Sequence, residues 1–268
     1  DVEADSGVAL VARVPGLWAK ANGQPITVGA DCAGLGSGIQ GIGDICSSVT
    51  TKFISELDDT AREVCQLFAG PQSSRSNVLD RPCAQDQHVD VYIAGFPCQP
   101  FSNLRRRLGA NDPTGRGTVC YRIASYIQNA LPTVVVLENV RAFRTTRNGR
   151  DFKEFVARLT RIRDKCTGEP NAYSIRVMDI NSKDQGSPQS RSRLYFVGIL
   201  KTAMDDPTVE INAPASLPFP DIDEFLDPIT LADDPGRYPG TPAANSNVDA
   251  AFDTIRRQGA AQSRTHTS

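Results

Sequence analysis

A cysteine between two prolines is the residue in this sequence best placed for nucleophilic chemistry. Cys98 lies in Gly95-Phe96-Pro97-Cys98-Gln99-Pro100-Phe101, directly after an apolar run, residues 91–94, that predicts a buried strand. The two prolines restrict the backbone of this loop. In open α/β sheets, ligands bind beyond the carboxyl ends of the strands. The sequence therefore predicts a thiol held at the edge of a sheet, where it can act as a nucleophile.

A carboxylate and two arginines accompany two later strands. Glu138 ends the apolar run 133–137, and Arg191 and Arg193 come just before the run 194–200. If these strands are neighbours in one sheet, the acid and the guanidinium groups gather beside the thiol. The thiol can then add to an electron-poor ring, while the carboxyl acts on a ring nitrogen and an arginine holds a ring oxygen.

A glycine-rich turn near the start of the chain predicts a cofactor site. Gly34-Leu35-Gly36-Ser37-Gly38 lies between a predicted strand, 26–30, and a predicted helix, where the backbone can approach a ligand closely. Glu56 lies 20 residues after Gly36, at the end of the next strand, where it can accept both hydroxyls of a ribose. NAD and S-adenosylmethionine both fit this pattern. A tight turn beside a surface glutamate is the alternative without a ligand.

Strands and helices alternate through most of the chain. The expected strands are residues 26–30, 51–57, 77–79, 89–94, 133–137, 173–178 and 194–200. Helices are expected after the glycine turn, after residue 58, over 118–130, and from a capping box at Asp151. The second of these helices should place Ala61, Val64, Cys65 and Phe68 on one apolar face. This alternation predicts an α/β fold with a doubly wound, mostly parallel sheet.

Composition divides the chain into a mildly basic body and an acidic tail. Residues 1–200 carry 24 Lys and Arg against 20 Asp and Glu, whereas residues 201–268 carry 5 against 11. We expect an N-terminal extension over 1–24 and a catalytic domain over 25–200. The proline-rich residues 201–268 are expected to be an extended or partly disordered appendage.

The cysteine and histidine counts exclude several kinds of site. The seven cysteines form no C-x-x-C pair, so we expect neither a disulfide framework nor a metal site. We expect the protein to reside in a reducing compartment. The two histidines, His88 and His266, make Ser–His–Asp catalysis a poor explanation. No apolar run reaches the length of a membrane span, and no signal peptide is visible.

Taken together and in order, these motifs resemble those of cytosine-5 DNA methyltransferases. The resemblance rests on Pro97-Cys98-Gln99, Glu138-Asn139-Val140, Gln189-x-Arg191-x-Arg193, the glycine turn and Glu56. It implies a Rossmann-like methyltransferase fold and transfer of a methyl group from S-adenosylmethionine to C5 of cytosine in DNA. It also implies a covalent bond between Cys98 and C6 of a base that flips out of the duplex.

The resemblance further implies a role for each site residue. Glu138 would hold the exocyclic amine and protonate N3, and Arg191 would contact the base oxygen, with Arg193 nearby. The cofactor would contact Leu35, Gly36, Ser37, Glu56, Leu57, Asn77 and Pro97, with Asp80 as the alternative to Asn77. A DNA substrate implies an intracellular protein, in the nucleus of a eukaryote or in the cytoplasm and nucleoid of a bacterium.

DNA contacts are implied for the loop after the thiol, namely for Gln99, Ser102, Arg105, Arg106, Arg107 and Arg116. The arginines of this loop can equally form an ordinary solvated surface. Four further arginines, at positions 141, 144, 147 and 150, leave the same two interpretations open.

Two departures from the family pattern affect what this chain does alone. Cys32 stands where the family usually has Phe, two residues before the first glycine of the turn. We expect the loss of this aromatic contact to weaken cofactor binding. The usual target-recognition region and two closing motifs are not recognisable after Leu200, so target recognition would require a partner or a missing segment.

Three other functions stay open at this point. An RNA branch of the family modifies transfer RNA, and it commonly carries Thr where this chain has Ser102, which favours DNA. A regulatory subunit with impaired catalysis would account for Cys32 and for the missing closing motifs, but the intact set of Cys98, Glu138 and Arg191 opposes it. An NAD oxidoreductase would account for the glycine turn but leaves Pro97-Cys98-Gln99 unexplained.

Overall fold

The structure, a computed structural model, describes residues 14, 17, 23–97, 118–208 and 210–218. All of them belong to one unit, Asp1–Pro220. Several predicted site residues lie outside the described residues: Cys98, Gln99, Ser102, Arg105, Arg106, Arg107 and Arg116. Their roles stay predictions, as does the division of the chain at residues 24 and 200.

Within the described residues, seven strands form one sheet in the order β3-β2-β1-β4-β5-β7-β6. The strands are β1 (Ile26–Asp31), β2 (Val49–Ser55), β3 (Ser73–Arg75), β4 (Val91–Gly95), β5 (Val134–Val140), β6 (Tyr173–Asn181) and β7 (Ser192–Leu200). Neighbours from β3 to β5 are parallel, whereas β7 runs antiparallel to both β5 and β6. The prediction of a mostly parallel sheet is confirmed.

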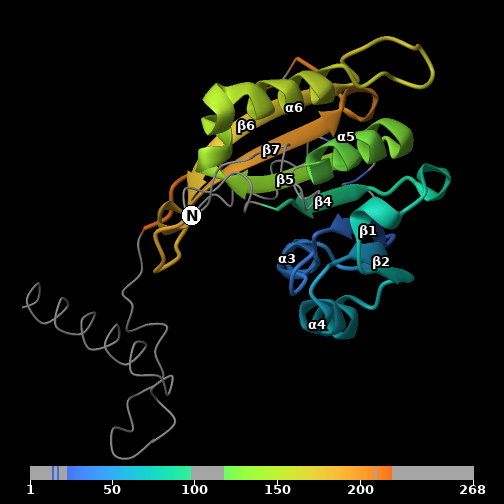
Figure 1. Cartoon of the computed structure of the whole chain (residues 1–268), viewed down its shortest axis with the longest axis vertical. Coiled ribbons are helices and arrows are strands. Elements are labelled where there is room, and N and C mark those ends of the chain that lie inside the picture. Colours follow the sequence, from blue (N-terminus) through green and yellow to red (C-terminus); the bar gives the residue numbers. More distant parts are fainter. Residues whose placement is uncertain (1–13, 15–16, 18–22, 98–117, 209, 219–268) are drawn as a thin grey trace, which may run out of the picture. The chain divides into compact units, whose positions relative to one another are not determined.

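Helices cover both faces of the sheet (Figure 1). Helices α3 (Ser37–Ile45) and α4 (Asp59–Ala69) pack on one face, and α5 (Val119–Ala130) and α6 (Arg150–Thr160) pack on the other. Short 3₁₀ turns are η1 (Val78–Asp80), η2 (Cys83–Gln85), η5 (Arg141–Arg144), η6 (Thr146–Gly149), η7 (Ser182–Asp184) and η8 (Lys201–Ala203). Among the described residues, no helix has both the length and the apolar character needed to cross a bilayer.

An aromatic cluster between the sheet and α6 fixes the end of β4. The ring of Phe96 lies 5.4 Å from that of Phe143 and 5.2 Å from that of Phe155, measured between centroids. Phe196 of β7 completes the cluster, with its ring 5.3 Å from that of Phe155. Tilted and edge-to-face rings at these separations attract each other beyond the burial of their area. The chain is therefore anchored one residue before Pro97.

The predicted strand at 77–79 is wrong. The third strand is Ser73–Arg75, and Val78–Asp80 forms a 3₁₀ turn capped by Asn77. The Asn77 side-chain oxygen accepts a hydrogen bond from the backbone N–H of Leu79 at 3.0 Å. Such a local side-chain bond competes with the ladder of a strand, and here it prevails.

Two helix predictions also need correction. Phe68 is 79% exposed, and Cys65 is the residue of α4 that is buried. The predicted capping box is not formed, because α6 begins at Arg150 after Gly149, with no side-chain cap. Asp151 is buried instead and accepts a hydrogen bond from the guanidinium of Arg147 at 2.8 Å.

Candidate active site

The segment that leads to Cys98 is held against β5 by a buried amide. Asn139 is fully buried, and its Nδ2 donates to the backbone oxygen of Phe96 at 3.1 Å. Its Oδ1 accepts from the N–H of Val140 at 2.8 Å, which fixes the orientation of the amide. One step earlier in the chain, Glu138 is the register partner of Gly95. The start of the thiol loop and Glu138 therefore lie side by side, as the sequence predicts.

Glu138 forms an ion pair with Arg193 beside Gly95. Oε1 of Glu138 lies 2.7 Å from Nε of Arg193, and the side chains are 32% and 19% exposed. A Cβ added at Gly95 would lie 3.6 Å from Oε2 of Glu138. The backbone of β4 thus comes close to the carboxylate because residue 95 has no side chain.

The environment of Glu138 stabilises its protonated form relative to that of an exposed glutamate. Burial raises the pKa of Glu138, and this effect outweighs the attraction of Arg193 and Arg191, which lower it. Burial, together with the charge of Glu138, also raises the pKa of Tyr195, its partner across to β7. A carboxyl group that keeps its proton to higher pH than usual is suited to general acid chemistry.

The two predicted arginines occupy different environments. Arg193 contacts the Glu138 carboxylate directly, whereas Arg191 is exposed and acts on it only through its charge. The backbone of Arg191 is fixed in the turn before β7: its N–H donates to Oδ1 of Asn181 at 2.8 Å, and its oxygen accepts from the N–H of Ser182 at 3.2 Å. Sequence reasoning did not single out Asn181, whose signal is a polar side chain at the end of a strand.

A cavity of about 530 Å³ borders Gly95. The described residues that line it are Cys32, Ser55, Glu56, Leu57, Asp58, Ser76, Asn77, Val78, Leu79, Gly95, Pro97 and Val119. Its volume falls within the range of roughly 300–1,000 Å³ that is typical of small-molecule sites. Because Gly95 borders both this cavity and Glu138, a ligand in the cavity lies next to the acid.

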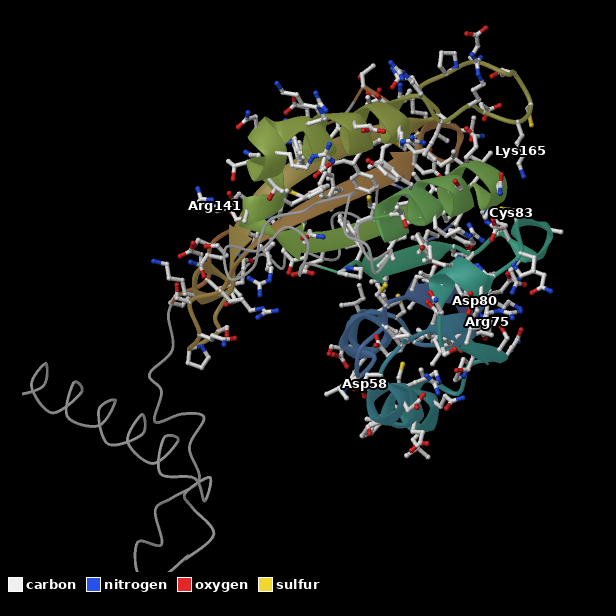
Figure 2. All side chains as sticks on the ribbon, viewed as in Figure 1. Asp58, Arg75, Asp80, Cys83, Arg141 and Lys165 are labelled. Carbon is white, nitrogen blue, oxygen red and sulfur yellow. The ribbon has the colours of Figure 1, made fainter. Side chains whose placement is uncertain are left out.

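Glu56 presents a carboxylate to this cavity in a fixed orientation. Its Oε2 accepts from the N–H of Gly34 at 2.8 Å, and its Oε1 accepts from the N–H of Asp58 at 3.0 Å. An ionised carboxylate has about four lone-pair positions, so each oxygen can accept one further hydrogen bond. The arrangement fits the two hydroxyls of a ribose. Asp58, labelled in Figure 2, also caps α4 by accepting from the N–H of Ala61 at 2.8 Å.

The glycine turn is built for a close approach between β1 and α4. Gly36 has a left-handed φ of 88°, and a Cβ added there would lie 2.9 Å from Sγ of Cys65. Only glycine adopts this backbone conformation readily and leaves the Cys65 side chain undisturbed. The turn thus supports the cavity wall through Gly34 and Glu56, while Leu35, Gly36 and Ser37 are not among the described residues that line the cavity.

The structure distinguishes between Asn77 and Asp80, the two alternatives for a cofactor contact in this segment. Asn77 lines the cavity, whereas Asp80 is exposed and is not among the described lining residues. Of the seven predicted cofactor contacts, four line the cavity: Glu56, Leu57, Asn77 and Pro97. Sequence reasoning missed Ser55, at the end of β2, and it missed Val78 and Leu79, which line the cavity because this segment forms a 3₁₀ turn.

A buried ion network stabilises the wall of this cavity. Asp31, at the end of β1, is fully buried and accepts hydrogen bonds from both terminal guanidinium nitrogens of Arg81, at 2.9 and 2.6 Å. The hydroxyl groups of Tyr92 and Ser55 also donate to it, at 2.6 and 2.8 Å. Arg81 directly follows η1, so the network ties the wall formed by Val78 and Leu79 to the sheet.

The network continues into α5 through a second buried carboxylate. Asp86 lies 3.2 Å from Nε of Arg81 and 2.6 Å from Nη2 of Arg122. The guanidinium of Arg81 also lies over the rings of Phe53 and Tyr126, at 4.5 and 4.7 Å from their centroids. No local pattern in the sequence predicts this arrangement, since Asp31 and Arg81 are 50 residues apart.

Cys32 lines the cavity but is not suited to act as a nucleophile. Burial, with smaller effects from the charges of Asp31 and Glu56, raises the pKa of the Cys32 thiol far above its usual value. The thiol therefore stays protonated, and the thiolate is the reactive form of cysteine. Its left-handed φ of 53° is uncommon for a residue other than glycine.

Comparison with known proteins gives a consistent picture. The model of a family described as C-5 cytosine-specific DNA methylase matches residues 29–230. The chain is 35% identical over 167 residues to type II methyltransferase M.NgoBI of Neisseria gonorrhoeae, covering 61% of this chain and 49% of the relative. It is 31% identical over 171 residues to M.HaeII of Haemophilus aegyptius, covering 64% and 48%. The chain thus spans about half the length of these relatives.

Solved structures share the fold. The Entamoeba histolytica methyltransferase EhMeth matches with a TM-score of 0.58 and 20% identity, covering 80% of this chain and 62% of that chain. The S. pombe Dnmt2 methyltransferase matches with a TM-score of 0.57 and 15% identity, covering 83% and 65%. The sheet and its helices therefore form a Rossmann-like methyltransferase fold.

Proposed function

Because this chain belongs to the C-5 cytosine-specific DNA methylase family, we propose that it transfers a methyl group from S-adenosylmethionine to C5 of cytosine in DNA. One observation carries the proposal: Gly95 borders the cavity and also lies beside the carboxylate of Glu138, which pairs with Arg193. A proton donor for a base thus stands beside a site for a small cofactor.

The cavity suits the proposed cofactor in size and in its polar groups. S-adenosylmethionine, when bound, supplies an electrophilic methyl group on its sulfonium. Glu56 would accept the ribose hydroxyls, Asn77 would bind the adenine amino group, and Leu57 would contact the adenine ring. Pro97 would place the backbone of the thiol loop against the ligand. Among the residues of the glycine turn, Leu35, Gly36 and Ser37 would contact the methionine part.

The proposed chemistry on the base uses a thiolate, an acid and an arginine. The Cys98 thiolate forms a bond to C6 while Glu138 gives a proton to N3, which makes C5 nucleophilic. C5 takes the methyl group from the sulfonium, and S-adenosylhomocysteine leaves. The C5 proton then passes to water, elimination of the Cys98 thiolate restores the C5–C6 double bond, and N3 returns its proton to Glu138. Arg193 is better placed than Arg191 to hold the base oxygen, because it already lies against Glu138. The target base must leave the stack, since C5 and C6 are inaccessible inside a duplex.

Covalent trapping tests this proposal. Duplex DNA with 5-fluorocytosine at the target base should form an adduct that survives denaturing electrophoresis when S-adenosylmethionine is present. Fluorine at C5 cannot leave as a proton does, so the enzyme stays bound through sulfur. Cys98→Ala should abolish the adduct. Cys83→Ala is the matched control, because this thiol is exposed and is not among the described residues that line the cavity. An adduct that survives Cys98→Ala would refute the role of Cys98.

The substrate and the competence of the chain are tested alongside. Methyl transfer should occur on duplex DNA and not on transfer RNA, and calorimetry should detect S-adenosylmethionine binding. No cofactor binding would instead favour a regulatory subunit. We further propose that the choice of target sequence depends on a partner or on a segment outside the described residues. The protein would act where DNA is, in a nucleus or in a bacterial cytoplasm and nucleoid.

A further inference from the structure

Basic residues are concentrated in one segment that the proposed active site does not use. Residues 141–163 contain eight Arg and Lys against two acids, a net charge of +6, whereas the whole chain has a net charge of −2. This segment forms η5, η6 and helix α6. In Figure 2, the labelled Arg141 and Lys165 lie at opposite ends of the α6 layer.

Several of these cations already have partners. Arg141 pairs with Asp179 at 2.8 Å, and Arg147 pairs with Asp151 at 2.8 Å. The guanidinium of Arg144 lies 5.4 Å from the centroid of the Phe152 ring. These three residues are therefore part of the packing around the helix rather than free charges.

Glu154 is the acid exposed on α6, and its charge is also matched. Arg158 pairs with Glu154 at 3.2 Å and lies over the ring of Tyr121, with its guanidinium carbon 4.4 Å from the centroid. The exposed acid of this helix therefore does not neutralise the remaining cations.

Arg163 donates from its guanidinium to the backbone oxygen of Gly168 at 2.7 Å. The other three cations on α6 and just beyond it have no such partner. Arg150, Lys153 and Arg161 are exposed, and within the part of the chain that the structure describes none of them pairs with a carboxylate. We call these three residues the α6 basic row.

The basic row lies along one face of the helix. Positions 150, 153, 157 and 161 follow each other at steps of three or four residues, which places them on one stripe of a helix. Ala157, the small residue in the middle, leaves space between the cations. Together with Arg147, Asn148 and Glu154, the row and Ala157 line an open cleft of about 810 Å³.

The length of the row matches a nucleic-acid backbone. Arg150 and Arg161 are separated by roughly 16 Å along the helix axis at a rise of about 1.5 Å per residue. Successive phosphates of a DNA strand advance by about 3.4 Å, so the row extends over several phosphates. The described residues that line the cleft include no aromatic or large apolar side chain, as binding to a lipid surface would require.

We propose that the α6 basic row binds the phosphate backbone of duplex DNA away from the target cytosine. The identity of the polyanion rests on the proposed function. Helix α6 follows β5 and two short turns, so Arg150 comes only 12 residues after Glu138 in the chain. Contacts to phosphates add affinity and salt dependence but carry no sequence information. The row would therefore hold the duplex without selecting its sequence.

Salt-dependent binding tests this inference. Fluorescence anisotropy with a labelled duplex is measured on the whole chain from about 50 to 200 mM salt, and the slope of log K against log salt is taken. The test variant is Arg150→Gln/Lys153→Gln/Arg161→Gln. The control, Arg75→Gln/Arg176→Gln/Lys201→Gln, removes the same charge from positions outside the basic segment.

The row variant should lose about 0.9 in slope for each phosphate contact, or roughly two to three in total. We expect its affinity at low salt to fall at least tenfold, on the order of one lost charge-assisted contact or more. The control should change affinity less than about threefold, since its three cations lie outside the basic row and exposed charges act weakly. A row variant with the wild-type slope, or a wild-type chain that binds no duplex, would overturn the inference.

Two further readouts separate this inference from the proposed function. Calorimetry with S-adenosylmethionine on the row variant should match the wild type, which shows that the fold is intact. A row variant that loses transfer RNA binding but keeps duplex binding would overturn the assignment to DNA. A chain that binds duplex through the row but forms no adduct with 5-fluorocytosine would contradict the proposed function and leave this inference standing.

Discussion

Two carboxylate–arginine pairs, Asp31–Arg81 and Glu138–Arg193, lie at the carboxyl ends of parallel strands, and they differ in burial and in the number of hydrogen bonds that the carboxylate accepts. Asp31 is fully buried and accepts four hydrogen bonds, two of them from Arg81. Glu138 keeps about a third of its side chain exposed, and among the described residues it contacts the single guanidinium of Arg193. One carboxylate is saturated with donors, and the other has free lone pairs.

This difference distinguishes a carboxylate that stabilises the structure from one that is available for chemistry. A buried charge is tolerated only when partners replace the water it has lost, and the network around Asp31 does this completely. Such a group has no capacity left for a substrate. Glu138 is desolvated enough for its pKa to be raised, yet it stays accessible from the solvent side. This combination of a perturbed pKa and open lone pairs is typical of functional carboxyls.

The largest expected effect is the loss of stability when the Asp31–Arg81 pair is broken. Arg81→Met leaves the carboxylates of Asp31 and Asp86 buried without their shared cation, so the free energy of unfolding should fall by about 3–5 kcal/mol. Arg193→Met should cost only about 0.2–1 kcal/mol, because both members of that pair still contact water. Chemical denaturation of the two variants measures the contrast.

A double variant controls for lost packing around Arg81. Asp31→Leu/Arg81→Met removes both charges of the bidentate pair and should recover part of the stability lost in Arg81→Met alone. Equal losses of stability in Arg81→Met and Arg193→Met would show that the two pairs do not differ in kind.

The second effect concerns activity at the other carboxylate. Glu138→Gln keeps the shape of the side chain but removes the proton donor, so methyl transfer to duplex DNA should fall by roughly 10² or more. Stability should not fall, since the change removes a carboxylate whose ionised form burial disfavours. Radiolabelled methyl transfer and thermal unfolding are measured on the same preparations. Retained activity in Glu138→Gln would remove this residue from the chemistry.

A third change tests the contact between the cavity and the acid. A methyl group added in Gly95→Ala would lie 3.6 Å from Oε2 of Glu138 and 3.8 Å from the backbone oxygen of Cys32, both ordinary contact distances. The fold should tolerate it, but the reacting groups would be separated, and we expect about a tenfold loss of methyl transfer. Binding of S-adenosylmethionine, measured by calorimetry, should change much less than turnover.

Gly198→Ala is the matched control for this substitution. Its added Cβ would lie 3.4 Å from a ring carbon of Tyr173 in the core of the same sheet, away from the cavity. Turnover should therefore stay close to that of the wild type. A loss of turnover in Gly198→Ala as large as that in Gly95→Ala would mean that a general disturbance of the sheet, and not the contact between the cavity and Glu138 at Gly95, limits the reaction.

The sequence predicted the parts of the site that depend on strand ends. β-branched runs defined β4 and β5, and parallel neighbours bring their carboxyl ends together, so Glu138 beside the thiol loop followed directly. Glu56 was predicted in the same way, from its place after a strand. These residues were within reach because the periodicity of a strand and the rules of α/β topology determine their position.

The buried ion network could not be predicted. Asp31 and Arg81 come from distant segments, and a charged residue in a sequence predicts exposure unless its partner is known. Asn77 was assigned to a strand because its neighbours are apolar, while its own side chain favours the 3₁₀ turn. Both failures concern polar contacts between or within loops, which leave no periodic signal.

The smallest effect discriminates between the two arginines near Glu138. Positions 191 and 193 are two residues apart, so a strand would place both on one face, and the sequence alone cannot rank them. In the structure β7 begins only at Ser192, and Asn181 fixes the backbone of Arg191 in the preceding turn.

Arg193 lowers the pKa of Glu138 by its charge and its hydrogen bond, so Arg193→Gln should raise that pKa further, and Arg191→Gln should raise it less. Because the pKa is raised in the folded state, the stabilising effect of the proton is complete below the unfolded pKa and disappears as pH rises through the folded one. In Arg193→Gln this loss should extend to higher pH. Carbon-13 NMR titration of labelled glutamate side chains, assigned through Glu138→Gln, follows the shift directly. A larger shift in Arg191→Gln would transfer the assignment of the base-oxygen contact back to Arg191.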